Sequence, residues 1–164
     1  MLTARLCLCI ALFLGCVAAV EAEEALPSAQ NIEVRIEREG GKKVLWDLWS
    51  NEILFEALLK PVEKGNLEWI EVWRKLRPFA DAGAAESIDI SIARALPINT
   101  EKILGLIGKG FELSSVCTSP FIEPDPGVAE AYEKRALKAL AQIKNPKLRA
   151  IAAECAANVK LPLA

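Results

Sequence analysis

The chain contains no histidine among its 164 residues. Histidine is the commonest general base in enzymes and the commonest metal ligand. This chain therefore lacks the residue type most often used for either role. Ser-His-Asp and Cys-His catalytic arrangements are excluded, as are zinc sites that contain histidine. We therefore predict no metal ion and no cofactor, and we expect a protein without enzymatic activity.

An excess of charge of one sign is also missing. The chain has 20 basic and 22 acidic residues, a formal net charge of −2, and no basic block. Proteins that bind nucleic acid carry a basic patch or stripe, and polybasic segments attach proteins to anionic membranes. We expect no nucleic-acid partner, and no membrane attachment through a charged surface.

The first 22 residues have the layout of a secretory signal peptide. One basic residue, Arg5, precedes an apolar run from Leu6 to Val20, and small residues follow as far as Ala22. Signal peptides combine these features, and the run is short for a membrane helix, which needs about 20 apolar residues. We predict cleavage after Ala19 or Ala22 and export, with the periplasm as the expected compartment and secretion as an alternative.

A second feature of this segment concerns its cysteine. Residues Leu12–Cys16 resemble the lipobox of bacterial lipoproteins, in which the cysteine becomes the lipidated first residue. The Gly15-Cys16 pair fits that motif, and Phe13 stands where leucine is usual. The resemblance implies a lipid anchor on Cys16, so membrane attachment depends on this modification.

Few cysteines remain once the signal segment is removed. Of the five in the chain, Cys7, Cys9 and Cys16 lie within the first 22 residues, which leaves Cys117 and Cys155. In an oxidising compartment two remaining cysteines most often pair. We predict a disulfide bond between Cys117 and Cys155, with two separate buried thiols as the alternative.

The remainder, roughly 142 residues, has the length of one domain. We predict a flexible segment over 23–30 and a single helical domain over 31–164. Asn31–Arg38 alternates apolar and charged residues, which is typical of a strand, and Gly40-Gly41 can turn the chain into a partner strand at Lys42–Trp46. The sequence thus predicts a small N-terminal β-hairpin, with a helix over Asn31–Arg38 as the alternative.

Helical spacing of apolar residues continues through the rest of the chain, interrupted by proline, glycine and asparagine. The predicted fold class is mainly α, a compact bundle of about five to six helices built from αα-hairpins. Asn66, Asn99 and Asn145 each follow one expected helix and precede another, so a short HEAT-like array is an alternative. The expected helices are Leu48–Glu63, Leu67–Arg77, Ala84–Leu96, a short one around 103–107, one from Asp125-Pro126 to Ile143, and Lys147–Val159.

Four tryptophans form two pairs at helical spacing, Trp46 with Trp49 and Trp69 with Trp73. We favour the interpretation that each pair packs in the core. The alternative is that a pair provides a stacking platform for a sugar or an anchor in a protein interface. The basic neighbours of the second pair and the proline-rich loop after Cys117 mark two candidate binding surfaces. The candidate partner-binding residues are Trp69, Trp73, Arg74, Arg77, Phe121 and Ile122.

These features predict an exported, non-catalytic module that binds a protein or another component of the cell envelope. The alternative is a carboxylate-based hydrolase of cell-wall glycan, because Glu52 and Glu56 share one helix face and paired carboxylates hydrolyse glycosides. The Glu86-Ser87 pair resembles the catalytic segment of lytic transglycosylases. That family also has a Gly-Leu-Met-Gln segment, and the only methionine of this chain is Met1.

Overall fold

The computed structural model describes residues 26–160, and within that range the chain is compact and mainly helical, as predicted. The residues for which we predict cleavage (after Ala19 or Ala22) and lipidation (Cys16) lie outside the described range. The helices are α1 (Ala29–Glu39), α2 (Gly41–Trp49), α3 (Glu52–Glu63), α4 (Leu67–Leu76), the 3-10 helix η1 (Arg77–Phe79), α5 (Ala82–Ala95), α6 (Thr100–Leu104), α7 (Leu113–Val116), α8 (Val128–Ala141) and α9 (Arg149–Val159).

The predicted N-terminal β-hairpin is wrong, and the helical alternative is correct, since α1 and α2 occupy both proposed strands. Ser28 caps α1 by accepting a backbone hydrogen bond of 3.1 Å. Gly40, with a φ of 84°, then separates the two helices at the predicted turn. α1 buries Ile32 and partly buries Ile36, four residues further on, and exposes Val34. This is the burial pattern of a helix face rather than of a strand.

Nine α-helices occur in residues 26–160, more than the five to six that were predicted. The expected helix Leu48–Glu63 is divided, because Asn51 caps a new helix by accepting a hydrogen bond from the backbone of Leu54 at 3.1 Å. The helix α1, which was expected only as an alternative, and the short helix α7, which was not expected, add to the number. None of the helices in this range has the length and apolar character needed to cross a bilayer. The HEAT-like arrangement stays a prediction.

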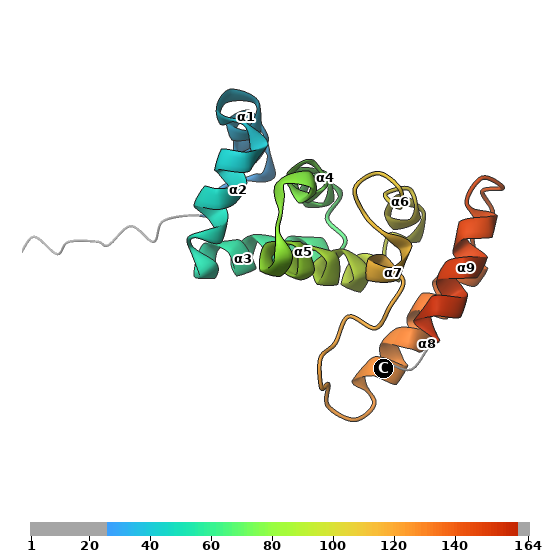
Figure 1. Cartoon of the computed structure of the whole chain (residues 1–164). Helices are drawn as coiled ribbons and strands as arrows, with labels where there is room; N and C mark the ends of the chain where they lie inside the picture. The colour runs from blue at the N-terminus through green and yellow to red at the C-terminus, as the bar shows by residue number, and fades with distance from the viewer. Residues whose placement is uncertain (1–25, 161–164) are drawn as a thin grey trace, which may run out of the picture.

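The core is centred on α3 and α5, which lie side by side (Figure 1). α4 packs against α1, α2 and α3 and is therefore covered on several sides. Asn66 caps α4 by accepting hydrogen bonds from two backbone N–H groups, as its sequence position predicted. Asn99 donates a hydrogen bond to the carbonyl of Gly65, which joins the turn before α4 to the turn before α6.

The C-terminal helices α8 and α9 form a hairpin at the opposite end of the molecule from α1 (Figure 1). The predicted disulfide bond is confirmed: Cys117, which ends α7, is bonded to Cys155 of α9, and their Cα atoms lie 5.0 Å apart. The hydroxyl group of Tyr132 in α8 donates a hydrogen bond of 2.8 Å to the carbonyl of Ala93 in α5. Burial raises the pKa of the Tyr132 phenol, which keeps it protonated as a donor.

Ion pairs connect the N-terminal helices. Arg35 of α1 lies 2.7 Å from Asp47 of α2 and 3.2 Å from Glu39, measured between side-chain nitrogen and oxygen atoms. The hydrogen bond from Arg35 is the main cause that lowers the pKa of Glu39 to about 2. In α4, a hydrogen bond from Arg74 likewise lowers the pKa of Glu71 to about 2. Both carboxylates therefore favour the folded state while they are ionised.

Acidification is expected to destabilise the fold between pH 4.5, the ordinary pKa of glutamate, and about pH 2, where Glu39 and Glu71 become protonated. A carboxyl group whose pKa is lower in the folded than in the unfolded state stabilises the protein at a pH above its unfolded-state pKa. This stabilisation is lost as the pH falls through the folded-state pKa. Urea unfolding followed by circular dichroism across this range measures the change. The E39Q/E71Q double variant should show a shallower decline, and an unchanged decline would contradict the assignment.

Candidate functional site

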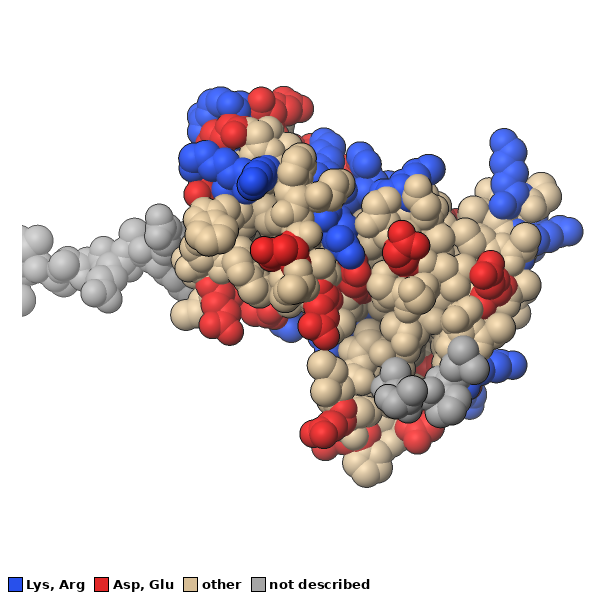
Figure 2. Space-filling model, viewed as in Figure 1, with Lys and Arg blue, Asp and Glu red and all other residues tan. Residues whose placement is uncertain are grey.

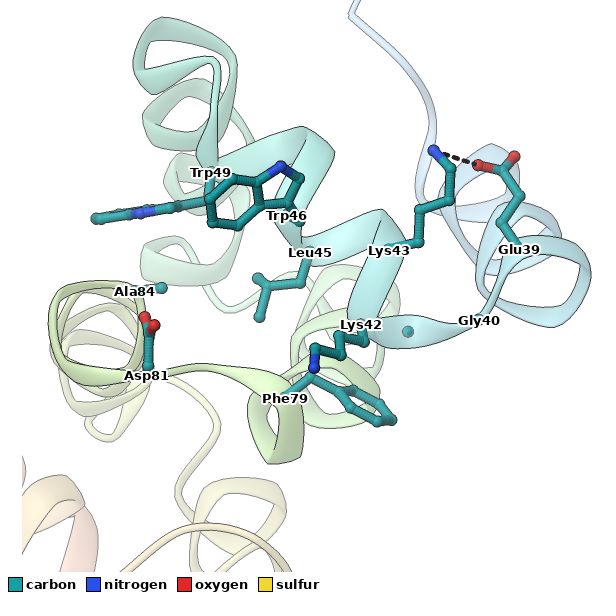
Figure 3. A pocket seen from close by; sticks show the side chains of 11 residues that line it. Glu39, Gly40, Lys42, Lys43, Leu45, Trp46, Trp49, Phe79, Asp81 and Ala84 are labelled. Carbon is teal, nitrogen blue, oxygen red and sulfur yellow. Dashed lines mark ion pairs between the residues drawn. The ribbon is translucent and has the colours of Figure 1, made fainter.

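Two grooves lie on either side of the N-terminal half of α5. The first, between α2 and the start of α5, has a volume of about 690 Å³ and is called here the Trp46 groove (Figure 3). The second, between α5 and the loop that follows α7, has a volume of about 850 Å³ and is called the Phe121 groove. The residues that line the Trp46 groove include Lys42, Leu45, Trp46, Trp49, Phe79 and Asp81.

Three aromatic side chains line the Trp46 groove. Trp46 is 67% exposed and Trp49 is 37% exposed, and both lie on one face of α2. Phe79 is 49% exposed and is placed by η1, the short turn that begins after α4 and contains Pro78. Its ring lies against Gly41, where an added Cβ atom would be 2.4 Å from Phe79 Cε2. Only glycine at position 41 therefore leaves the Phe79 ring in this place.

Polar groups stand at the edges of the same groove. Asp81 is the N-cap residue of α5, yet its side chain makes no capping hydrogen bond, and Figure 3 shows its carboxylate between Ala84 and Phe79 on the groove side. Neither Asp81 nor Lys42 forms an ion pair or a side-chain hydrogen bond with any residue in the range 26–160. Lys43, by contrast, lies 2.7 Å from Asp47. One carboxylate and one ammonium group are thus free to meet a ligand.

The surface around this groove is uncharged at its centre. Figure 2 shows an uncharged area over α2 and the start of α3, with basic side chains above it and acidic side chains below it in this view. A polar border around an apolar centre is the usual composition of a binding surface.

A chain of aromatic rings connects the Trp46 groove to the core. The ring of Trp49 meets Phe55 edge to face at 4.9 Å between centroids, and Phe55 meets Trp73 in the same way at 5.0 Å. The Trp49 ring also lies against Gly83 of α5, where a Cβ atom would be 3.3 Å away. Trp49 is therefore held in one orientation by the core, while Trp46 projects from the same helix without such support.

The second tryptophan pair, Trp69 and Trp73, for which the sequence analysis proposed partner binding, lies in the core. Both side chains are buried, and Trp73 is fully so. Its indole N–H donates a hydrogen bond of 3.2 Å to the carbonyl of Leu58 in α3. These residues hold α4 in the core, which is the role that the sequence analysis favoured for tryptophan pairs in general.

Arg74 and Arg77, the two basic residues predicted to bind a partner, both form ion pairs within the protein. Arg77 forms two parallel hydrogen bonds of 2.7 and 2.8 Å with the carboxylate of Asp89, which is buried in α5. This contact raises the pKa of Arg77. Arg74 donates to Glu71 at 2.8 Å on the same helix. Arg77 is thereby held against α5, whereas the Arg74 side chain remains 34% exposed, and the binding role of both stays a prediction.

The Phe121 groove contains the last two predicted residues. The Phe121 ring meets Tyr132 edge to face at 5.7 Å, and the Arg94 guanidinium lies 5.4 Å from its centroid, so this side chain anchors the loop. Ile122 is 77% exposed and lines the groove. Of the six candidate residues, Ile122 has the greatest access to a partner.

The carboxylates considered for glycan hydrolysis are arranged differently from a hydrolase site. Glu52 and Glu56 are exposed. Glu86 lines the Phe121 groove with Asp89 and Glu123, but Asp89 is held by Arg77, and the two glutamates are exposed. Glycosidases that use two carboxylates keep the acid in an apolar pocket. Within residues 26–160, no group of three potential metal ligands occurs.

Comparison with protein-family models, with curated protein sequences and with solved structures finds no match to this chain. The arguments for function therefore come from the grooves themselves. Sequence reasoning named Trp46 and Trp49 as a pair but assigned the binding role to the other pair. It missed Phe79, Asp81 and Lys42, because they reach the groove only through the packing of η1 and α5 against α2.

Proposed function

We propose that this protein is an exported, non-catalytic binding module of the cell envelope and that the Trp46 groove holds its partner protein or envelope component. The observation that carries this proposal is Trp46, a tryptophan left 67% exposed at the wall of a groove. A tryptophan side chain has about 150–250 Å² of surface, so leaving it in water forgoes a large gain from burial. Tryptophan is also the residue type most enriched among the energetic hot spots of interfaces.

Other features support the same proposal. The signal-like first 22 residues and the disulfide bond are both compatible with an oxidising compartment outside the cytoplasm. An anchor on Cys16 would tether the module to a membrane, and cleavage after Ala19 or Ala22 would release it. The mass of the mature protein distinguishes these forms. Binding is preferred over glycan hydrolysis because the exposed glutamates lack the buried acid that hydrolysis requires.

The test places a photoreactive amino acid at position 79, at the rim of the Trp46 groove, in the full chain expressed in the cells that export it. We expect a covalent adduct with an envelope component and strong loss of this adduct when Trp46 is also replaced by alanine. Loss of a hot-spot residue costs about 2 kcal/mol or more, which is about 30-fold in affinity.

The matched control is Leu67→Ala, which shortens an apolar side chain that is 55% exposed and lines neither groove. Adduct formation should be unchanged in this variant. An adduct that persists in Trp46→Ala, or the absence of any adduct from position 79, would exclude the Trp46 groove as the binding surface.

A further inference from the structure

We propose that the ligand of the Trp46 groove is a glycan, bound through a neutral pyranose ring that stacks on Trp46 and forms hydrogen bonds with Asp81 and Lys42. This inference rests on the proposed binding function and names the chemical class of the ligand. It draws on three properties of the groove, namely an exposed flat ring, a free acceptor with a free donor, and a balance of charge.

The first property is the flat surface of Trp46. Figure 3 shows the broad face of its indole ring with no labelled side chain in front of it, and shows the ring of Trp49 from the edge. A pyranose ring has one face made mainly of C–H groups, which carry small positive partial charges. The face of an aromatic ring is negative, so the two surfaces attract each other while both are removed from water. Trp49 then forms a second wall whose orientation is fixed by Phe55.

The second property is the pair of free polar groups. The Asp81 carboxylate can accept hydrogen bonds from two hydroxyl groups, and the Lys42 ammonium can donate to a ring or hydroxyl oxygen. Both line the groove, and neither is engaged by another side chain in the described part of the chain. Sugar hydroxyl groups both donate and accept, so a saccharide can satisfy the two together. Both groups are exposed to solvent, so a ligand with hydroxyl groups can reach them, whereas a purely apolar ligand would gain no hydrogen bond from either.

The third property is the balance of charge around the groove. Its charged lining residues are two acids, Glu39 and Asp81, and two bases, Lys42 and Lys43. A ligand with a strong net charge would be attracted to one pair and repelled by the other. The volume of about 690 Å³ also lies within the range of about 300–1,000 Å³ found for small-ligand sites. Charge and size therefore favour a neutral saccharide over a charged peptide segment.

The experiment titrates the mature protein with neutral oligosaccharides, namely β-1,4-linked N-acetylglucosamine oligomers, cello-oligosaccharides and malto-oligosaccharides, using calorimetry and tryptophan fluorescence. We expect saturable binding of at least one series with a change in fluorescence. Trp46→Ala should weaken this binding by about tenfold or more, which is about 1.4 kcal/mol, because the surface on which the ring stacks is removed. Leu67→Ala should leave it unchanged.

Three further variants test the geometry. Asp81→Ala removes the acceptor and should weaken binding, whereas Asp81→Asn keeps a carbonyl acceptor and should restore part of it. Because the Asp81 side chain makes no capping hydrogen bond, neither change removes a contact of α5. Gly41→Ala should displace the Phe79 ring and reshape the groove without altering a core side chain.

The outcomes separate this inference from the proposed function. If no neutral oligosaccharide binds, or if Trp46→Ala and Asp81→Ala leave binding unchanged, the glycan assignment is wrong. If the glycan assignment fails but position 79 still forms a Trp46-dependent adduct with a protein, the Trp46 groove is a protein-binding surface and the proposed function stands. If neither a saccharide nor an adduct is found, both fail.

Discussion

Replacing Trp73 by alanine is expected to lower the free energy of unfolding by about 3–5 kcal/mol, the usual cost of truncating a buried aromatic residue. The Trp73 side chain is 0% exposed and meets the ring of Phe55 edge to face at 5.0 Å. Its removal leaves a cavity between α3 and α4 and takes the indole donor away from the carbonyl of Leu58. The free energy of unfolding of a domain is about 5–15 kcal/mol in total, so the loss expected for Trp73→Ala is a large part of it.

Urea unfolding followed by circular dichroism measures this effect, and Trp46→Ala is the matched control. Because Trp46 is 67% exposed, we expect its replacement to change stability by no more than about 0.5 kcal/mol. Trp73→Phe keeps a ring in the core and should fall between the two. Equal costs for Trp73→Ala and Trp46→Ala would contradict the assignment of one tryptophan to the core and the other to the binding surface.

Removing the disulfide bond with the C117A/C155A double variant is expected to lower the free energy of unfolding by about 4 kcal/mol. The two cysteines are 38 residues apart, and a cross-link over a loop of this length removes about that much conformational entropy from the unfolded chain. Both side chains are fully buried, so alanine avoids placing a polar group in the core. The bond also attaches α9 to the end of α7.

The same unfolding measurement, made on the oxidised protein and on the variant, gives the difference. Titration of free thiols in the unreduced mature protein is a direct check, and two free thiols would refute the bond. Saccharide binding supplies a second control, because the Trp46 groove contains no residue from α7, α8 or α9. We expect the folded double variant to keep its affinity in the Trp46 groove.

Prediction from the sequence worked best where local chemistry is sufficient. Asn66 marked a helix start correctly because an asparagine side chain satisfies the backbone N–H groups of the first turn, wherever the helix then packs. The pairing of Cys117 with Cys155 followed from the small number of cysteines. At the N-terminus the period of two in Asn31–Arg38 was misleading. Ile32 and Ile36 alone fit a helix face, and Val34 gave the appearance of a strand by lying on the exposed side.

The binding surface was harder to predict because it combines distant parts of the chain. Trp46, Phe79 and Asp81 come from α2, η1 and the start of α5, and no spacing in the sequence relates them. The signal that was available was Trp46 with Trp49, two large aromatic residues on one face of a short helix. That signal is the same for Trp69 and Trp73, so periodicity gave no means of choosing between the pairs.

The sequence alone determined that the described chain is mainly helical, that α4 begins after Asn66, and which cysteines pair, because these depend on local hydrogen bonding and on composition. Only the tertiary structure decided which tryptophans are buried. Both α2 and α4 pack against several other helices, but Trp73 lies on a covered face of α4, whereas Trp46 lies on the face of α2 that no other helix covers, beside an open groove. A helix pattern specifies which face is apolar, but the number of neighbours that cover this face depends on the position of the helix in the fold.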